Sequence, residues 1–282
     1  MSATRWVVAG LIGCGLLIVG TYVHARNGLL PLDKEARARA PGSFVELSDG
    51  QVHYEWHGPA DGSVTVMIHG FSTPSFVWAG LLPAAQGIEE PIDLVGYSMG
   101  GGIATYFTAN HPERVRRLAL IAPVGFPLNA GSAAQLIRLP LLGDWLTAVV
   151  GRSTVLSMME LPENQGKAIP DLAERYQVHM TYEGYLRALL STMRHYPMAE
   201  LEAEYKRIGS AGTPVLAIWG DLDSTVPPEN AKQVVKAAPQ TRVEMIIGGT
   251  HAITYSESEQ VSAALISFFT QPDSAPSEGP AS

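Results

Sequence analysis

The sequence predicts an α/β fold with a mostly parallel sheet, helices on both faces and an inserted helical cap. Short apolar runs alternate with helix-like segments over residues 43–123 and again over 208–270. This alternation is typical of parallel sheets, because neighbouring parallel strands are joined by crossover helices. Residues 124–207 interrupt the alternation with consecutive helix-like pieces rich in Leu, Met and Tyr. We therefore expect a core formed by 43–123 and 208–270, with a cap over 124–207.

The strands of the core are expected where short runs rich in Val, Ile and Leu end at Gly, Pro or polar turn residues. The turn residues Ser48-Asp49-Gly50 separate the first two runs, which predicts a hairpin. The expected strands cover residues 43–47, 51–56, 64–68, 92–95, 117–123, 214–219 and 242–247.

The helices are expected where longer segments mix apolar and polar residues. In the core they cover 76–86, 102–110, 228–238 and 258–269, and in the cap 132–150, 153–160, 170–178, 181–195 and 198–207. The cap contains several methionines, which we expect to form its interior, with some lining an apolar pocket for an acyl or alcohol group.

The N-terminal region contains an uncharged segment from Trp6 to Val23, 18 residues long. As a helix it would span about 27 Å, close to the hydrocarbon thickness of a bilayer. Residues 1–25 are therefore expected to be a membrane anchor or a signal peptide, followed by an exposed linker over 26–42.

Two alternatives to a retained anchor are open. A signal peptide cleaved after Val23-His24-Ala25 would release the chain to the periplasm or the exterior. The run Leu11-Ile12-Gly13-Cys14 resembles a lipobox, although the segment stays apolar after Cys14.

The basic residues around this segment bear on its orientation. Arg5 precedes it, and Arg26, Lys34, Arg37 and Arg39 follow it. This count favours the cytoplasmic side for the following domain, whereas cleavage would override it, so the side of the membrane stays open.

The composition excludes several classes of function. The net charge of −8 and the isoelectric point near 5.5 argue against nucleic acid as a partner. Cys14 is the single cysteine, which rules out an internal disulfide and a cysteine-based metal site. His53 and His57 would lie about 13 Å apart on a strand, too far for one ion. We expect no metal and no cofactor, and a disordered tail over 271–282.

The segment Gly96-Tyr97-Ser98-Met99-Gly100 connects an apolar strand to a helix. Strand, G-x-S-x-G and helix form a nucleophile elbow, in which a tight turn presents the serine at the helix N-terminus. Ser98 is the candidate nucleophile. The backbone N–H groups of Met99 and of Phe71, which follows His69-Gly70 at a strand end, are the expected oxyanion hole.

Two further residues complete the expected catalytic set. A serine hydroxyl needs a base, and His251 can accept its proton and later return it. An aspartate would orient that imidazole, and Asp223 is favoured over Asp221. The chain order Ser98, Asp223, His251 is the order of α/β hydrolases.

Four motifs together resemble the α/β-hydrolase fold family over residues 43–270. They are His69-Gly70-Phe71, the elbow, Gly220-Asp221-Leu222-Asp223-Ser224-Thr225-Val226-Pro227 and Gly249-Thr250-His251. Within the family, the chain resembles membrane-anchored serine esterases and monoacylglycerol-lipase-like hydrolases. Ser98 follows His69 by 29 positions, where the family places an additional strand–helix unit. We therefore expect that unit to be absent, so that strands 64–68 and 92–95 become neighbours.

The sequence thus predicts a serine hydrolase cleaving lipid-like or other apolar esters through an acyl-enzyme on Ser98. A catalytically silent shortened variant is the first alternative, motivated by the short segment before the elbow. A carbon–carbon bond or amide hydrolase of the same fold is the second. The expected partners are a small ester or lipid and a membrane, and the oligomeric state stays open.

Overall fold

The computed structural model describes residues 3–58, 64–78, 91–128, 132–161, 169 and 171–271. Its main sheet has five strands, all parallel, in the order β3-β4-β5-β6-β7. The expected core strands are confirmed, with small shifts at their ends. They are β3 (Thr65–Ile68), β4 (Ile92–Tyr97), β5 (Val115–Ile121), β6 (Val215–Gly220) and β7 (Arg242–Ile246).

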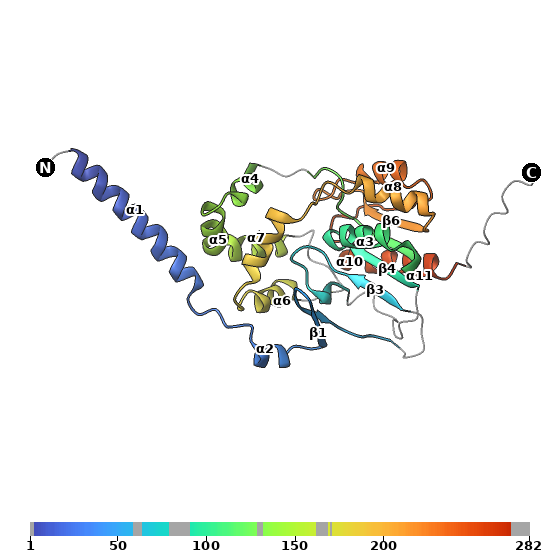
Figure 1. Ribbon diagram of the computed structural model, residues 1–282, viewed down its shortest axis with the longest axis horizontal. Coiled ribbons are helices and arrows are strands. Elements are labelled where there is room, and N and C mark those ends of the chain that lie inside the picture. Colours follow the sequence, from blue (N-terminus) through green and yellow to red (C-terminus); the bar gives the residue numbers. More distant parts are fainter. Residues whose placement is uncertain are drawn as a thin grey trace, which may run out of the picture.

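Different helices cover the two faces of this sheet, as Figure 1 shows. Alternate residues of a strand point to opposite faces. Thus Leu94, Leu118 and Trp219 join one buried cluster with α3, α8 and α9, while Val95, Ala119 and Ile218 join the other with α10 and α11. The helices are α3 (Met99–Asn110), α8 (Glu202–Ala211), α9 (Asn230–Ala237), α10 (Ile253–Ser256) and α11 (Ser258–Phe269). The central strands are therefore covered on both sides.

The predicted hairpin is present as a separate two-stranded sheet. Its strands, β1 (Ser43–Leu47) and β2 (Gly50–Tyr54), pair antiparallel with Val45 opposite Val52. Both strands are largely exposed. The hairpin therefore contributes little to the core.

The pairing of β3 directly with β4 agrees with the expected absence of one strand–helix unit. Val66 lies opposite Leu94, and Ile68 lies opposite Gly96. The sequence predicts a buried strand here, but β3 is half-buried. The reason is that β3 lies at the edge of the described sheet. The short helix η1 (Ser75–Trp78) follows it. Most of the expected helix over 76–86 lies outside the described residues.

The cap contains α4 (Ser132–Arg138), α5 (Leu142–Met159), α6 (Leu172–His179) and α7 (Tyr185–His195). The prediction of one helix over 132–150 and another over 153–160 is wrong. Pro140 breaks the first helix, because proline lacks the N–H that an inner turn requires, and α5 then runs on through residue 153. The cap boundary expected at residue 207 falls within α8, which packs on α3 and α9.

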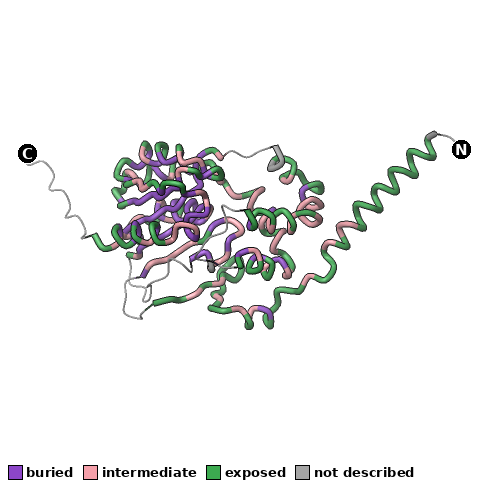
Figure 2. Tube along the Cα trace, turned by 180° about the vertical axis from the view of Figure 1, so that it is seen from behind, coloured by how far each residue is buried: buried purple, intermediate pink, exposed green. Residues whose placement is uncertain are grey.

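The N-terminal helix α1 (Ala3–Arg26) projects away from the rest of the chain (Figure 1). It is long and apolar enough to cross a membrane, and its segment Thr4–Arg26 has no buried residue. Figure 2 shows the contrast with the sheet and its helices, where the buried residues gather. The linker contains the short helix α2 (Lys34–Ala38), begun by the Asp33 carboxylate accepting from the Ala36 N–H at 2.8 Å.

A buried carboxylate ties β4 to β5. Asp93 is 2% exposed and accepts a hydrogen bond from Nε of Arg116 at 3.0 Å, with a second contact to Nη2. The next residue, Arg117, donates to the carbonyl oxygens of Phe269 and Gln271. These contacts fasten the end of α11 to the sheet.

Replacing Arg116 with Ala should lower the free energy of unfolding by about 1–3 kcal/mol, because the buried Asp93 carboxylate loses a charged donor. Urea denaturation of the full chain in detergent measures this loss. The exposed pair Glu202–Lys206, 2.7 Å apart, supplies the control: Lys206→Ala should leave the urea midpoint close to that of the parent chain, because water screens the pair. Equal losses in the two variants would contradict the prediction.

Candidate active site

Ser98 occupies a strained turn between β4 and α3. Its φ of 54° and ψ of −117° lie outside the regions that a side chain readily adopts. The turn needs glycine on both sides: a Cβ on Gly100 would collide with the carbonyl oxygen of Ile68, and one on Gly96 with that of Gly100. The strain is held by close backbone packing, as is common at functional sites.

Backbone hydrogen bonds fix the Ser98 main chain to the neighbouring strand. Its N–H donates to the Ile121 carbonyl at 2.9 Å, and its own carbonyl accepts from the Val124 N–H at 3.1 Å. The side chain is therefore presented from a rigid turn. Ser98 is only 7% exposed.

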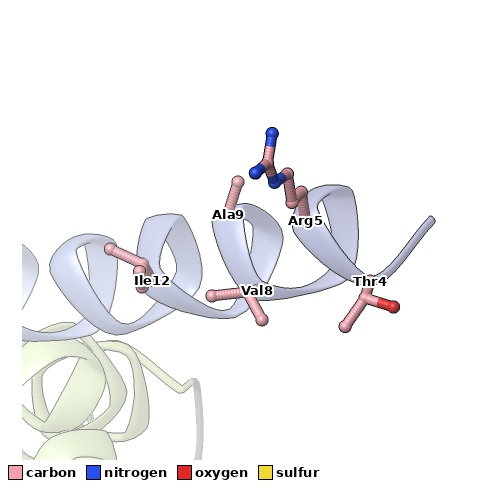
Figure 3. Close-up of a pocket in the computed structure, with 5 residues that line it drawn as sticks. All are labelled: Thr4, Arg5, Val8, Ala9 and Ile12. Carbon is pink, nitrogen blue, oxygen red and sulfur yellow. The ribbon is translucent and has the colours of Figure 1, made fainter. Parts of the chain in front are cut away.

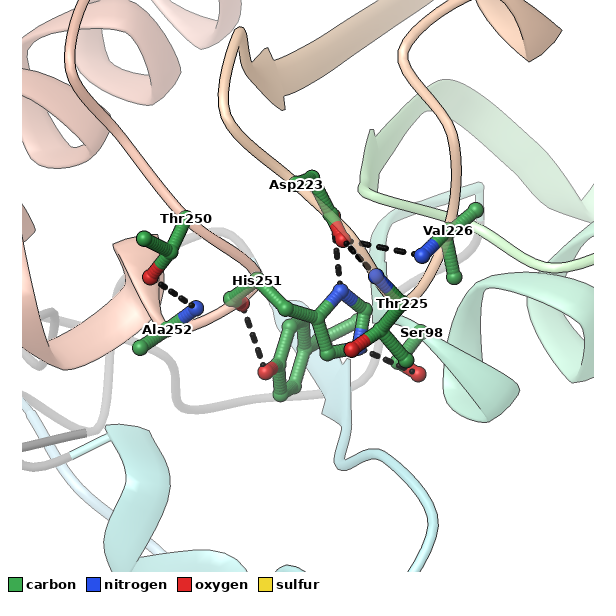
Figure 4. A network of polar contacts seen from close by, with 8 residues as sticks. Ser98, Asp223, Thr225, Val226, Thr250, His251 and Ala252 are labelled. Atoms are coloured by element: carbon green, nitrogen blue, oxygen red, sulfur yellow. Dashed lines mark hydrogen bonds and ion pairs between the residues drawn. The ribbon is translucent and has the colours of Figure 1, made fainter. Parts of the chain in front are cut away.

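His251 lies between Ser98 and Asp223 (Figure 4). Its Nε2 is 3.0 Å from the Ser98 Oγ, and its Nδ1 is 2.7 Å from the Asp223 Oδ2. The three side chains come from the loops after β4, β6 and β7. The structure thus brings together the three residues that the sequence singled out.

The Asp223 carboxylate is oriented by two backbone amides. Its Oδ1 accepts from the N–H groups of Thr225 at 2.9 Å and Val226 at 2.8 Å, leaving Oδ2 for His251 (Figure 4). A carboxylate can only accept, so the imidazole proton belongs on Nδ1. Nε2 is then the acceptor that faces the serine hydroxyl.

Asp221 has a different partner. Its Oδ1 accepts from the Gly248 N–H at 2.6 Å, which ties the loop after β6 to the loop after β7. This contact joins the two loops, whereas the carboxylate that contacts the His251 imidazole belongs to Asp223.

Tyr97 contacts both the backbone and the ring of His251, a role that its place in the sequence does not predict. Its hydroxyl donates to the His251 carbonyl at 2.8 Å, and the two rings lie 5.3 Å apart at 32°. Burial raises the pKa of Tyr97, so the phenol keeps its proton and stays a donor. In the sequence Tyr97 occupied a variable position of the G-x-S-x-G motif, which gave no signal of this contact.

The loop that carries Phe71 packs against the elbow. A Cβ on Gly70 would come within 3.1 Å of the Ser98 Cβ. The next residue but one, Ser72, has φ of 60°, and its carbonyl accepts from the Tyr185 hydroxyl of α7 at 2.8 Å. Met99 is the first residue of α3. The oxyanion roles of the Phe71 and Met99 amides remain predictions.

The described part of the chain holds no group of three or more His, Cys, Asp or Glu residues arranged for a metal. His57 contacts Glu55 at 3.3 Å, whereas His53 lies against the Pro41 carbonyl.

The chain resembles known hydrolases in sequence. A family model described as the alpha/beta hydrolase fold matches residues 84–258. A pimeloyl-[acyl-carrier protein] methyl ester esterase of Neisseria meningitidis is 25% identical over 203 residues, covering 68% of this chain and 75% of the esterase. A (lyso)-N-acylphosphatidylethanolamine lipase of Bos taurus is 33% identical over 93 residues, 33% of this chain and 26% of the lipase.

The fold is shared with solved structures as well. The crystal structure of a membrane phospholipase A, described as a bacterial virulence factor, has a TM-score of 0.58 and 18% identity. The match covers 94% of this chain and 96% of that one. At this identity the likeness concerns the fold.

Replacing Tyr97 with Phe should slow covalent capture of Ser98 by a fluorophosphonate about fivefold, the equivalent of one hydrogen bond. The rate is measured by intact mass against time. Tyr106→Phe, on the exposed face of α3, should react at the parent rate. An unchanged rate in Tyr97→Phe would show that the His251 loop holds its position without the phenol.

Proposed function

This chain belongs to the α/β-hydrolase fold family, and we propose that it is a serine hydrolase cleaving carboxylic esters. The observation that carries the proposal is the unbroken hydrogen-bonded series Asp223–His251–Ser98, with distances of 2.7 and 3.0 Å. Such a series lets an imidazole remove the serine proton during attack.

The reaction follows from the geometry. The Ser98 Oγ attacks the ester carbonyl while Nε2 of His251 takes its proton. The imidazolium, stabilised by Asp223, then protonates the departing alcohol and leaves an acyl group on Ser98. Water, activated by the same Nε2, releases the acid. The Met99 and Phe71 amides would donate to the oxyanion at each stage.

We propose that the substrate carries an apolar acyl chain. The matched relatives act, by their names, on a methyl ester and on a lipid, and the cap brings apolar residues towards the site. Met159, Leu172 and Tyr176 belong to the same buried cluster as Tyr97. Carbon–carbon bond or amide cleavage would use the same three residues and is separated by substrate screening.

Membrane attachment through α1 is part of the proposal. Val8, Ala9 and Ile12 project from its N-terminal half, with Arg5 nearer the terminus (Figure 3). The depression that these side chains line with Thr4 is formed by a single helix. Apolar side chains around a helix with no buried residue suit lipid as the surrounding medium.

Replacing Ser98 with Ala should reduce turnover of a medium-chain p-nitrophenyl ester by about 10⁴-fold or more. The parent chain should gain one fluorophosphonate adduct by intact mass, and the variant none. Ser210→Ala, an exposed serine of α8, is the matched control and should keep both. Absence of an adduct on the folded parent chain would favour the silent shortened variant.

Substitutions of Asp223 and Asp221 should have very different effects on kcat. Asp223→Asn should reduce kcat by about 10³–10⁴-fold, because an amide no longer favours the productive imidazole tautomer. Asp221→Asn keeps an acceptor for the Gly248 N–H and should change kcat less than about tenfold. The reverse order of effects would assign the orienting role to Asp221.

A further inference from the structure

The turn between α4 and α5 displays three leucines to solvent. Leu141 is 85% exposed, and Leu139 and Leu142 are 48% and 41% exposed. We call residues 139–142 the leucine turn. Adjacent exposed leucines are unfavourable in water and mark contact surfaces in folded proteins.

The backbone of the leucine turn is strained at Leu141. Leu141 has φ of 65°, in the left-handed region where glycine is the favoured residue. An exposed leucine there gains no core packing that would offset the strain. Strain of this kind persists where the surroundings impose it and is concentrated at functional positions.

Arg194 of α7 imposes the conformation. Its guanidinium donates to the carbonyl oxygens of Arg138 at 3.2 Å and Leu139 at 3.0 Å. It also pairs with Asp144 at 2.9 Å, and the Asp144 Oδ2 accepts from the Leu141 N–H at 3.1 Å. The hydrogen bond from Arg194 lowers the pKa of Asp144. The turn is therefore clamped from within the cap.

The same helix that follows the leucine turn binds the end of α1. Trp145 lies in the first turn of α5, and its Nε1 donates to the Thr21 Oγ1 of α1 at 3.0 Å. Farther along, the Leu30 N–H donates to the Thr181 carbonyl, and Glu183 donates back to the Leu30 carbonyl, each at 2.8 Å. These bonds hold the cap against the C-terminal end of α1 (Figure 1).

The end of α1 has the side chains of a membrane–water boundary. The uncharged stretch ends near Tyr22 and Arg26, and the guanidinium of Arg26 donates to the Tyr22 hydroxyl at 2.8 Å. Tyr, Trp and Arg are enriched at this level of a bilayer. Trp145 contacts α1 at the same level, which places the leucine turn beside the headgroups when α1 spans the bilayer.

We propose that Leu139, Leu141 and Leu142 insert into the boundary between headgroups and acyl chains of the bilayer that holds α1. The inference rests on the proposed membrane attachment. Exposed leucines suit fluid lipid, and Trp145, three residues beyond the turn, contacts Thr21 near the end of α1. The second contact fixes the cap on the membrane surface, where an apolar ester would be taken up.

The test uses the full chain in phosphatidylcholine vesicles. Cys14 is the single cysteine, so Leu141→Cys in a Cys14→Ser background takes one NBD label. Lipids with a doxyl group high on the acyl chain should reduce its emission at least about twofold. The control is Ile266→Cys, at a residue that is 53% exposed. It belongs to α11, a helix on the side of the molecule opposite to α1 (Figure 1). Its emission should not change.

Several outcomes would overturn the inference. If doxyl lipids fail to reduce the emission of the Leu141 label, as for the control label, and the chain still resists carbonate extraction, the second contact is refuted while the anchor stands. Self-quenching of the Leu141 label in detergent would assign the turn to a second copy of the chain. Failure of the chain to float with vesicles would refute the membrane attachment and this inference together.

A second variant distinguishes a membrane role of the Leu141 side chain from a role in folding stability. Leu141→Gly should raise the thermal midpoint by about 2–4 °C, because glycine adopts this φ without strain. It should also slow hydrolysis of a vesicle-embedded long-chain ester several-fold while sparing a soluble short-chain ester. A lower midpoint would show that the Leu141 side chain supports the fold, and would overturn the proposal.

Discussion

The site depends on the close backbone packing of β3, β4 and the start of α3. Backbone atoms approach so closely there that neither Gly96 nor Gly100 could carry a side chain. This packing forces Ser98 into a conformation that it would not adopt alone. Because the pairing of β3 with β4 supplies one wall of the turn, the edge strand of the described sheet is as necessary to the serine as its own loop.

The parallel sheet then explains how distant residues meet. The carboxyl ends of β4, β6 and β7 lie along one edge, and each contributes one polar side chain from the loop that follows. Local hydrogen bonds refine this placement: the Thr225 and Val226 amides aim Asp223, and the Tyr97 hydroxyl supports the His251 backbone. The sheet brings the three loops together, and these contacts set the orientations of their side chains.

Much of this arrangement could be predicted from the sequence, because it is encoded locally. Apolar runs gave the strands, and a glycine-rich turn between strand and helix gave the elbow. The two amides that hold Asp223 follow it directly and form a turn typical of aspartate. The roles of Tyr97 and Tyr185 were not readable, since each depends on a partner far away in the chain. The break at Pro140 was missed because the apolar pattern continues on both sides of it.

The hydrogen bond from Tyr185 of α7 to the Ser72 carbonyl constrains how the cap and the core could evolve. Here the core loop before the elbow is held in a strained conformation by a phenol that belongs to the insertion. A cap transplanted from a relative would have to bring a matching donor, so cap and core loop are expected to have changed together.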